Sequence, residues 1–141
     1  LMDDSPAKKD LWTRLHDSAD EIASQHDLKL VWLADADSAP EPSPQTAEQV
    51  YNITREALVN AARHANAKQI SVQMGQRDET YFVTIDDDGK GFDTSHPAPS
   101  VHFGLQIMQA RAKHVGGNIE VRSTPGQGTR VTLTWTSERV D

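Results

Sequence analysis

Two pairs of segments in which apolar residues alternate with polar ones constrain the fold more than any other feature. In the first pair, apolar side chains recur at every second position of residues 70–74 and of residues 81–85, with a charged turn at residues 77–79 between them. The second pair covers residues 119–121 and 131–135. A period of two places alternate side chains on one face of a strand, so each pair predicts an antiparallel hairpin with one buried face.

Three other segments have the apolar spacing of an amphipathic helix. The first spans residues 7–26, and the second runs from a cap at Thr46 to about His64. The third spans residues 105–115 and stops at two glycines. Apolar residues at steps of three and four lie on one face of a helix, so each of these segments is expected to pack against the sheet.

The segments between these elements decide how they combine. Residues 28–33 form a further apolar strand, and residues 39–44 contain three prolines, which exclude helix and central strand there. The resulting order is helix, strand, helix, strand pair, long loop, helix, strand pair. Adjacent strands interleaved with helices predict an α+β fold, in which helices cover one face of a mixed sheet.

The size and charge of the chain exclude several classes of protein. It has 141 residues, no cysteine and a formal net charge of −7. The length fits one domain, and the lack of cysteine excludes disulfides and thiolate metal sites. The negative charge argues against general nucleic-acid binding. Because no apolar run reaches the roughly 20 residues of a membrane span, and no signal peptide opens the sequence, we expect a soluble fragment of a longer protein.

Four polar side chains on the second helix form the first candidate site. Glu56, Asn60, Arg63 and His64 lie within about a quarter turn of one another at 100° per residue. They flank the apolar stripe of that helix, at the boundary where a core meets a cleft. Taken alone, such a row is more typical of an ordinary surface helix.

An acidic, glycine-rich loop forms the second candidate. Asp87 follows a strand on the side that faces the core, and Gly89 and Gly91 come next. A carboxylate at the edge of a core needs hydrogen-bond donors, and the exocyclic amine of a ligand is one possible source. Glycines allow a ligand to approach the backbone closely. A plain turn remains the alternative, whereas the EF-hand pattern is absent because no glutamate stands at its twelfth position.

Two further glycine segments are weak signals individually. Gly104 precedes the helix predicted to start at Leu105, and free amides at a helix start bind phosphate. The loop of residues 88–104 is long enough to act as a lid. The segment Gly126–Thr129 is explained by a hairpin turn, and no Walker loop occurs in the sequence.

Taken together, the four segments resemble the ATPase domain shared by histidine kinases, gyrase-type topoisomerases and Hsp90-type chaperones. Residues 55–65 resemble the asparagine box of that family and residues 87–91 its Asp-x-Gly-x-Gly box. Residues 102–108 and 126–129 resemble its second and third glycine boxes. The first and third of these segments are most similar to the nitrate/nitrite-sensor type of histidine kinase. The resemblance covers about residues 28–137 and implies a Bergerat-type fold, with a mostly antiparallel five-stranded sheet and about three helices on one face.

The resemblance implies a role for each matching residue. Asn60 would hold Mg²⁺, Arg63 and His64 would approach the phosphates of ATP, and Asp87 would accept from the adenine amine. The remaining positions would shape the pocket or the phosphate end, or act as a base: Gly89, Gly91, Gly104, Leu105, Thr129 and Glu56. One departure from the family is that Ser100, Val101 and His102 stand where a further glycine is usual, which predicts a shorter or stiffer lid.

One histidine resembles the phosphoacceptor of such kinases. His16 lies in a Leu-His-Asp-Ser segment, but residues 18–55 include a strand and three prolines, which leaves no room for the second helix of an acceptor hairpin. We therefore expect His16 to be a surface residue of the domain's own first helix. The other histidines lack partners at ligand spacing, which argues against zinc.

These observations predict a domain at residues 28–137, preceded by a helical segment at 1–27 that joins a dimerisation domain and followed by a tail at 138–141. The expected function is to bind Mg-ATP and phosphorylate a histidine on that separate domain, with a response regulator downstream. We expect a monomeric cytoplasmic portion of a membrane-bound sensor, itself without nucleic-acid or membrane contact. The alternatives are a serine kinase of the anti-sigma type and a degenerate interaction module that does not bind ATP.

Overall fold

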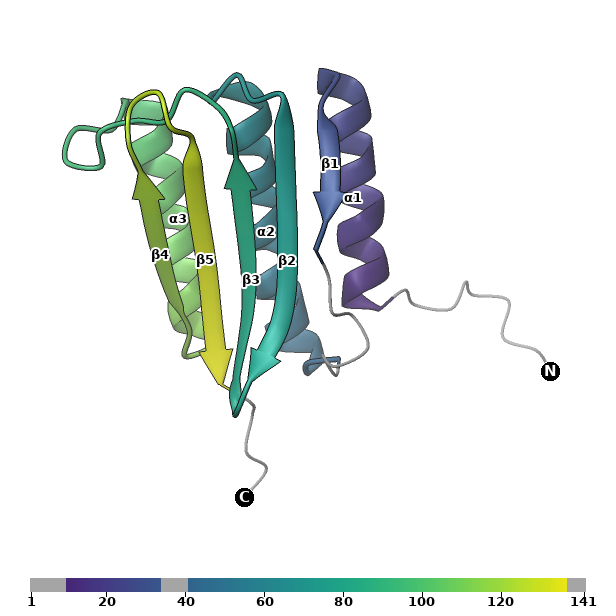
Figure 1. Ribbon diagram of the computed structural model, residues 1–141. Helices are drawn as coiled ribbons and strands as arrows, with labels where there is room; N and C mark the ends of the chain where they lie inside the picture. Colours follow the sequence, from purple (N-terminus) through teal and green to yellow (C-terminus); the bar gives the residue numbers. More distant parts are fainter. Residues whose placement is uncertain (1–9, 34–40, 137–141) are drawn as a thin grey trace.

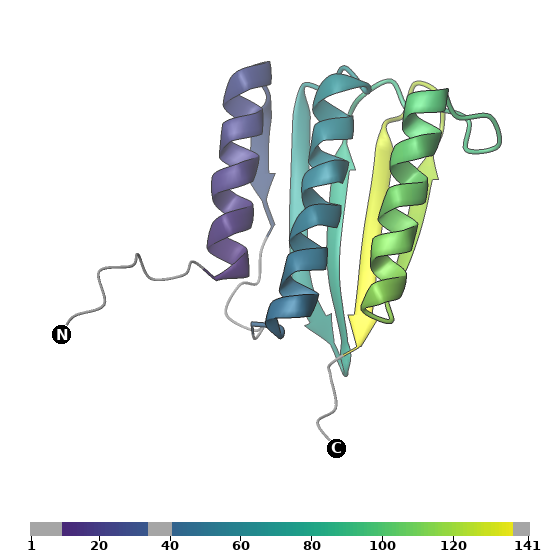
Figure 2. The same cartoon turned by 180° about the vertical axis from the view of Figure 1, so that it is seen from behind.

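A computed structural model describes residues 10–33 and 41–136, which form one sheet and the helices packed on it. Within these residues, all three helices cover the same face of a five-stranded sheet, as Figures 1 and 2 show from opposite sides. The predicted α+β architecture is confirmed. The elements are, in chain order, α1 (Leu11–His26), β1 (Lys29–Trp32), α2 (Pro44–Arg63), β2 (Gln69–Arg77), β3 (Thr80–Asp87), α3 (Pro99–His114), β4 (Asn118–Ser123) and β5 (Thr129–Thr136).

The sheet has the strand order β1-β2-β3-β5-β4. The short β1 runs parallel to β2, and the other neighbours are antiparallel, as the two predicted hairpins require. In this register Asp87, the last residue of the central β3, lies opposite Ile70 on one side and Thr129 on the other. The candidate carboxylate therefore lies at the C-terminal end of the central strand, with a neighbouring strand on each side.

The core lies between the sheet and the helices, and the alternating residues supply its sheet side. Val72, Val83 and Leu133 have no exposed surface, and their neighbours in sequence point to the opposite face. The helix side comes from α2, from α3 and also from α1, whose Leu15 is fully buried. Thus α1 shares one core with the rest of the protein. None of the helices in residues 10–33 and 41–136 has the length and apolar character needed to cross a bilayer.

The first turn of α2 differs from the sequence prediction. The helix begins at Pro44, and the cap is Ser43, whose hydroxyl accepts from the amide of Thr46 at 3.4 Å, so Thr46 is not the cap. Proline excludes the helix interior, but its fixed φ and missing N–H suit the first helical position. The connector therefore ends before Pro44 instead of including it.

The start of α3 also differs. The helix begins at Pro99 and not at Leu105, so six residues assigned to the long loop are helical, and Gly104 lies inside the helix. Proline again occupies the first position. The loop that remains between β3 and α3, residues 88–98, projects from the body of the protein (Figure 1).

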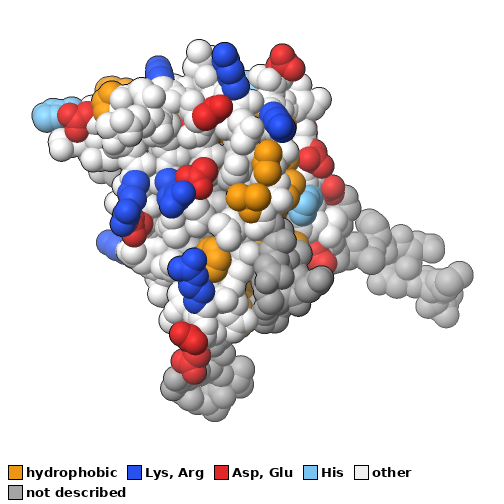
Figure 3. Space-filling model, viewed as in Figure 1, with side chains coloured by type: hydrophobic (Ala, Val, Ile, Leu, Met, Phe, Trp, Pro, Cys, Tyr) orange, Lys and Arg blue, Asp and Glu red, His pale blue; other side chains and the backbone are white. Residues whose placement is uncertain are grey.

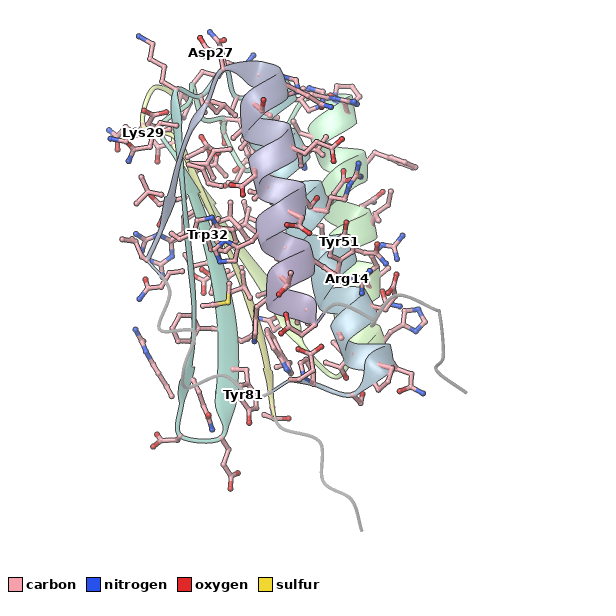
Figure 4. The ribbon with its side chains drawn as sticks, turned by 90° about the vertical axis from the view of Figure 1, so that its right-hand side faces the viewer. Arg14, Asp27, Lys29, Trp32, Tyr51 and Tyr81 are labelled. Atoms are coloured by element: carbon pink, nitrogen blue, oxygen red, sulfur yellow. The ribbon has the colours of Figure 1, made fainter. Side chains whose placement is uncertain are left out.

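Polar contacts of Arg14 and a ring contact of His16 connect α1 to α2 and β1. The guanidinium of Arg14 lies 4.2 Å from the centre of the Tyr51 ring on α2, where both residues are labelled in Figure 4, and Arg14 also pairs with Glu48 at 3.2 Å. The ring of His16 stacks on Trp32 of β1 with centroids 3.6 Å apart. His16 is thus part of the first helix, as predicted, but it is half buried and not a free surface residue.

The opposite face of the sheet carries no helix among the described residues, and it is mostly polar. Figure 3 shows basic and acidic side chains interspersed on it, with few hydrophobic ones. Arg130 on β5 pairs with Asp86 on β3 at 2.7 Å, and Arg122 pairs with Glu120 on β4 at the same distance. In these two pairs each arginine lies beside a carboxylate, which suits a sheet face exposed to water.

Candidate functional site

A cavity of about 290 Å³ opens at the end of the sheet where β3 stops, between α2, the start of α3 and the inner sheet face. Its volume is near the lower end of the range for small-molecule sites. Seven of the residues predicted from sequence line it: Asn60, Arg63, His64, Asp87, Gly91, Leu105 and Thr129. Segments that lie far apart in the sequence, from Asn60 to Thr129, therefore converge on one site.

The other three predicted residues, Glu56, Gly89 and Gly104, are not among the residues that line the cavity. Gly104 lies against the side chains of Glu56 and Asn60, where α3 approaches α2. Gly89 is buried against Ala65 and donates its amide to Asp87. Gly89 and Gly104 therefore contact residues that line the cavity, and none of the three residues lines it itself.

Asp87 supplies the carboxylate among the residues that line the cavity. Burial raises its pKa, while hydrogen bonds from the amides of Gly89 and Thr129 act in the opposite direction. The Gly89 amide lies 2.8 Å from Oδ1. Backbone amides of the protein therefore supply some of the hydrogen-bond donors that the sequence analysis expected from a ligand. The Asp87 carboxylate also lines the cavity, where a ligand can reach it.

The neighbouring carboxylate, Asp88, has the opposite environment. It is exposed, and its Oδ1 accepts from the amides of Lys68 at 2.8 Å and Gln69 at 2.9 Å. These bonds, that of Gln69 first, lower the pKa of Asp88. Asp88 thus anchors the glycine loop to the segment that follows α2, and Asp87 alone of the two faces the cavity.

Backbone hydrogen bonds join three loop segments at this end of the sheet. The amide of Lys90 donates to the carbonyl of Ala65 at 2.7 Å, and the carbonyl of Lys90 accepts from Gly126 at 2.6 Å. We call residues 64–68, 88–92 and 124–128 together the loop rim. Gly91 is required there because its φ is +61° and a Cβ would collide with the carbonyl oxygen of Thr124.

The phosphate site that the sequence predicted at Gly104 is not at a helix start. Because α3 begins at Pro99, the first-turn amides, which lack intrahelical carbonyl partners, belong to residues near Ser100 and Val101. Both of these residues line the cavity. The structure therefore places the start of α3 beside the cavity, six residues earlier in the sequence than the predicted start at Leu105.

The sequence reasoning missed the apolar lining of the cavity. Ala57, Ala61, Ile85, Met108 and Val131 form part of its surface. The periodic pattern predicts that apolar residues of this kind belong to the core. Met108 is fully buried and also borders the cavity. Phe92, which follows the glycine loop, was also missed, although its position directly after Gly91 could have indicated it.

The residues present are compatible with a magnesium ion that is held mostly by its ligand. Within the described ranges, no three histidine or acidic side chains gather as a metal cluster. Mg²⁺ is commonly bound by one or two protein oxygens, together with waters and phosphate oxygens. Asn60, half buried at the cavity wall, offers one amide oxygen for such a site.

The cavity at the end of the sheet, with three helices on one sheet face, fits the class of nucleotide-binding ATPase domains that the family comparison identifies. Residues 45–139 match the model of the histidine kinase-, DNA gyrase B- and HSP90-like ATPase family. The chain belongs to this family. The match includes α2 and all elements after it, and therefore every residue of the candidate site.

Curated relatives of this chain are sensor kinases. The chain is 39% identical over 89 residues to an uncharacterised sensor-like histidine kinase of Chloroflexus aurantiacus, which covers 60% of this chain and 15% of the relative. It is 32% identical over 84 residues to the sensor protein VraS of Staphylococcus aureus, covering 60% of this chain and 24% of VraS. The sensor histidine kinase YdfH of Bacillus subtilis is 35% identical over 92 residues, which span 64% of this chain and 23% of YdfH. The matches thus span a quarter or less of these relatives.

The fold also resembles that of a solved kinase domain. The histidine kinase domain of the blue-light activated histidine kinase EL346 from Erythrobacter litoralis superimposes with a TM-score of 0.77, over 97% of this chain and 65% of that chain. The two sequences are 20% identical, so this similarity concerns the fold.

Proposed function

We propose that this domain binds ATP with magnesium and supplies the γ-phosphoryl group for the phosphorylation of a histidine on a separate dimerisation domain. The observation that carries the proposal is the position of Asp87, a partly desolvated carboxylate that lines a cavity in a chain of this ATPase family. In the proposed complex, Asp87 accepts a hydrogen bond from the adenine amine. Phosphotransfer would place the protein in two-component signalling, with a response regulator as the downstream partner.

The remaining cavity residues fit the other parts of the nucleotide. Asn60 and Arg63 lie in the last turn of α2, His64 caps the helix, and all three line the cavity. In the proposed complex, Asn60 contributes an oxygen to magnesium, and Arg63 and His64 lie near the phosphates. Bound magnesium would screen the charge that develops on the β- and γ-phosphates during transfer.

The glycines and apolar residues would shape the base pocket. Gly89 and Gly91 hold the loop rim close to the cavity, and Leu105 and Thr129 border it from α3 and β5. Gly104 allows α3 to approach Glu56 and Asn60. The position of Glu56 behind the cavity surface is compatible with a role in positioning Asn60, as an alternative to direct action as a base.

Three aspects of the parent protein are part of the proposal. The helix α1 would connect to the histidine-bearing dimerisation domain, and the isolated domain would be a monomer. The domain would be a cytoplasmic portion of a membrane-bound sensor; two relatives are named as a sensor protein and a sensor histidine kinase. The predicted similarity to the nitrate/nitrite-sensor type remains a prediction.

Calorimetry of ADP binding in the presence of magnesium tests the proposal. The wild-type domain should bind ADP, and Asp87→Ala should lose most of the affinity. A matched control is Asp86→Ala, because Asp86 is the preceding residue of the same strand but pairs with Arg130 on the opposite sheet face. It should bind ADP like the wild type. Equal binding by both variants would refute the role of Asp87, and failure of the wild type to bind any adenine nucleotide would refute the function.

A phosphotransfer assay tests the second half of the proposal. The full-length kinase, or this domain mixed with its dimerisation domain, should incorporate label from [γ-³²P]ATP on a histidine. A phosphohistidine is labile to acid and stable to alkali, whereas a phosphoserine has the opposite behaviour. Acid-stable label would therefore favour a serine kinase and would overturn the histidine assignment.

A further inference from the structure

Ser123, the last residue of β4, is in hydrogen-bond contact with three groups around the cavity. Its Oγ lies 2.8 Å from the amide nitrogen of Phe92 and 3.0 Å from the carbonyl oxygen of Gly128. It also lies 2.8 Å from the hydroxyl oxygen of Thr129, the residue paired with Ser123 across the sheet. Phe92 and Thr129 both line the cavity, whereas Ser123 itself does not.

The chemistry of these groups determines the direction of each bond. A serine hydroxyl has one hydrogen and two lone pairs. The amide of Phe92 can only donate, so it occupies one lone pair of Ser123. The carbonyl of Gly128 can only accept, so it takes the single hydrogen. What remains on Ser123 is one lone pair, and the hydroxyl of Thr129 must therefore donate to it.

This assignment determines what Thr129 presents to the cavity. With its hydrogen directed to Ser123, the Thr129 hydroxyl offers only lone pairs to a ligand. Asp87, its partner across β3 and β5, is an acceptor in its ionised form and lines the same wall. This end of the cavity consequently presents acceptors from both side chains. Such a wall binds an amino group and repels a carbonyl oxygen at the same place.

We propose that Ser123 is a positioning residue for base selectivity: by holding the hydroxyl hydrogen of Thr129 away from the cavity, it keeps Thr129 from donating a hydrogen bond beside Asp87. The wall then favours a 6-aminopurine over a 6-oxopurine. The inference rests on the proposed function, because it concerns how the same site discriminates between nucleotides. Ser123 acts through Thr129 and is not itself a contact residue.

The experiment compares ADP with inosine diphosphate, which carries an oxygen in place of the 6-amino group. Calorimetry with magnesium gives the ratio of the two dissociation constants for each protein. Wild type should prefer ADP by about tenfold or more, because a carbonyl facing unpaired acceptors loses its hydrogen bonds. In Ser123→Ala the Thr129 hydroxyl is free to turn and donate into the cavity, so the ratio should fall severalfold. Loss of packing alone would weaken both nucleotides equally and leave the ratio unchanged.

A double variant tests whether the effect passes through Thr129. Ser123→Ala combined with Thr129→Val has no hydroxyl hydrogen to release, so its preference for ADP should return toward that of wild type. An unchanged ratio in Ser123→Ala, or the same reduced ratio in the double variant, would overturn the inference while leaving ADP binding by wild type, and hence the proposed function, intact.

A measurement on wild type alone covers the case in which Ser123→Ala does not fold. Purine riboside diphosphate has only hydrogen at position 6, and it should bind more tightly than inosine diphosphate if the Thr129 hydroxyl does not donate into the cavity. Tighter binding of inosine diphosphate would show that a hydroxyl donates into the cavity, and would overturn the inference. If wild type binds none of the three nucleotides, both the inference and the proposed function are refuted.

Discussion

The carboxamide of Asn60 on α2 lies directly against the α-carbon of Gly104 on α3. A Cβ atom built on Gly104 would stand 3.2 Å from Asn60 Nδ2 and 3.0 Å from Glu56 Oε1. These separations are tighter than ordinary packing contacts, so any side chain at position 104 displaces the two polar groups. The glycine in the middle of a helix, unfavourable by propensity, is explained by this approach.

Replacement of Gly104 by alanine should therefore lower the affinity for nucleotide while leaving the free energy of unfolding nearly unchanged. The Cβ would push the Asn60 amide from its place, and the affinity for magnesium-ADP should fall about tenfold. Stability should change by less than about 1 kcal/mol, because alanine favours the helix by a similar amount to the crowding it causes. Calorimetry and urea denaturation measure the two effects. Gln106→Ala, on the exposed side of the same helix, should change neither. Full affinity in Gly104→Ala would contradict the proposed place of Asn60.

Replacement of Asp87 by asparagine should stabilise the unliganded protein, by about 0.5–1 kcal/mol at neutral pH. Burial raises the pKa of Asp87 above its ordinary 3.8, so the folded protein binds this proton more tightly than the unfolded chain does. Stability from the protonated form is fully present below pH 3.8 and is lost as pH rises through the raised pKa. The advantage of the variant should thus appear on going from pH 4 toward pH 7. Denaturant titrations at several pH values measure it, and a variant less stable than wild type at neutral pH would show this reasoning to be wrong.

Replacement of Asp88 by alanine should have the opposite sign. Its carboxylate accepts from two amides, so its removal should destabilise the protein by about 1 kcal/mol at neutral pH. The pKa of Asp88 is lowered, and its contribution is present above the ordinary value of 3.8 and is lost as pH falls through the lowered value. The gap between variant and wild type should close on acidification. A gap that is constant with pH would mean that the charge of Asp88 contributes nothing.

Replacement of Arg14 by methionine tests the attachment of α1. Methionine keeps most of the aliphatic length but removes the charge over the Tyr51 ring and the pair with Glu48 (Figure 4). The free energy of unfolding should fall by about 0.5–1 kcal/mol. Urea denaturation at low and high salt measures the loss, which should be smaller at high salt. Lys113→Met, an exposed position on α3, serves as the control, and an equal effect of both changes would contradict the assignment.

The sequence predicts the order of the elements well because most of them bury one regular face. The alternation of residues 70–74 and 81–85 places Val72, Val83 and Ile85 in the core, and the structure buries all three. The helix starts were less accurate for a specific reason. The first turn of α3, with its exposed Ser100 and His102, faces the cavity and the solvent, so it lacks the apolar repeat that identifies a helix.

The residues of the candidate site were likewise predicted only in part. Asn60, Asp87 and Thr129 are recognisable because each lies in a short motif of polar and glycine residues, and the structure brings them to one cavity. The apolar lining could not be distinguished from core by local pattern. Whether Met108 faces a core or a ligand depends on how three segments that are distant in the sequence pack together. A local stretch of sequence contains no information on that packing.

The loop rim has a thermodynamic consequence for any ligand that enters the cavity. Its three segments are already joined through Lys90 to Ala65 and Gly126, so the loop rim is preorganised and little conformational entropy is left to lose there. The segment of residues 93–98, which projects from the body of the protein in Figure 1, is exposed for most of its length and makes its hydrogen bonds largely within itself. The ordering that accompanies binding should therefore be concentrated in residues 93–98 and not in the loop rim, which separates recognition at one end of the ligand from closure at the other.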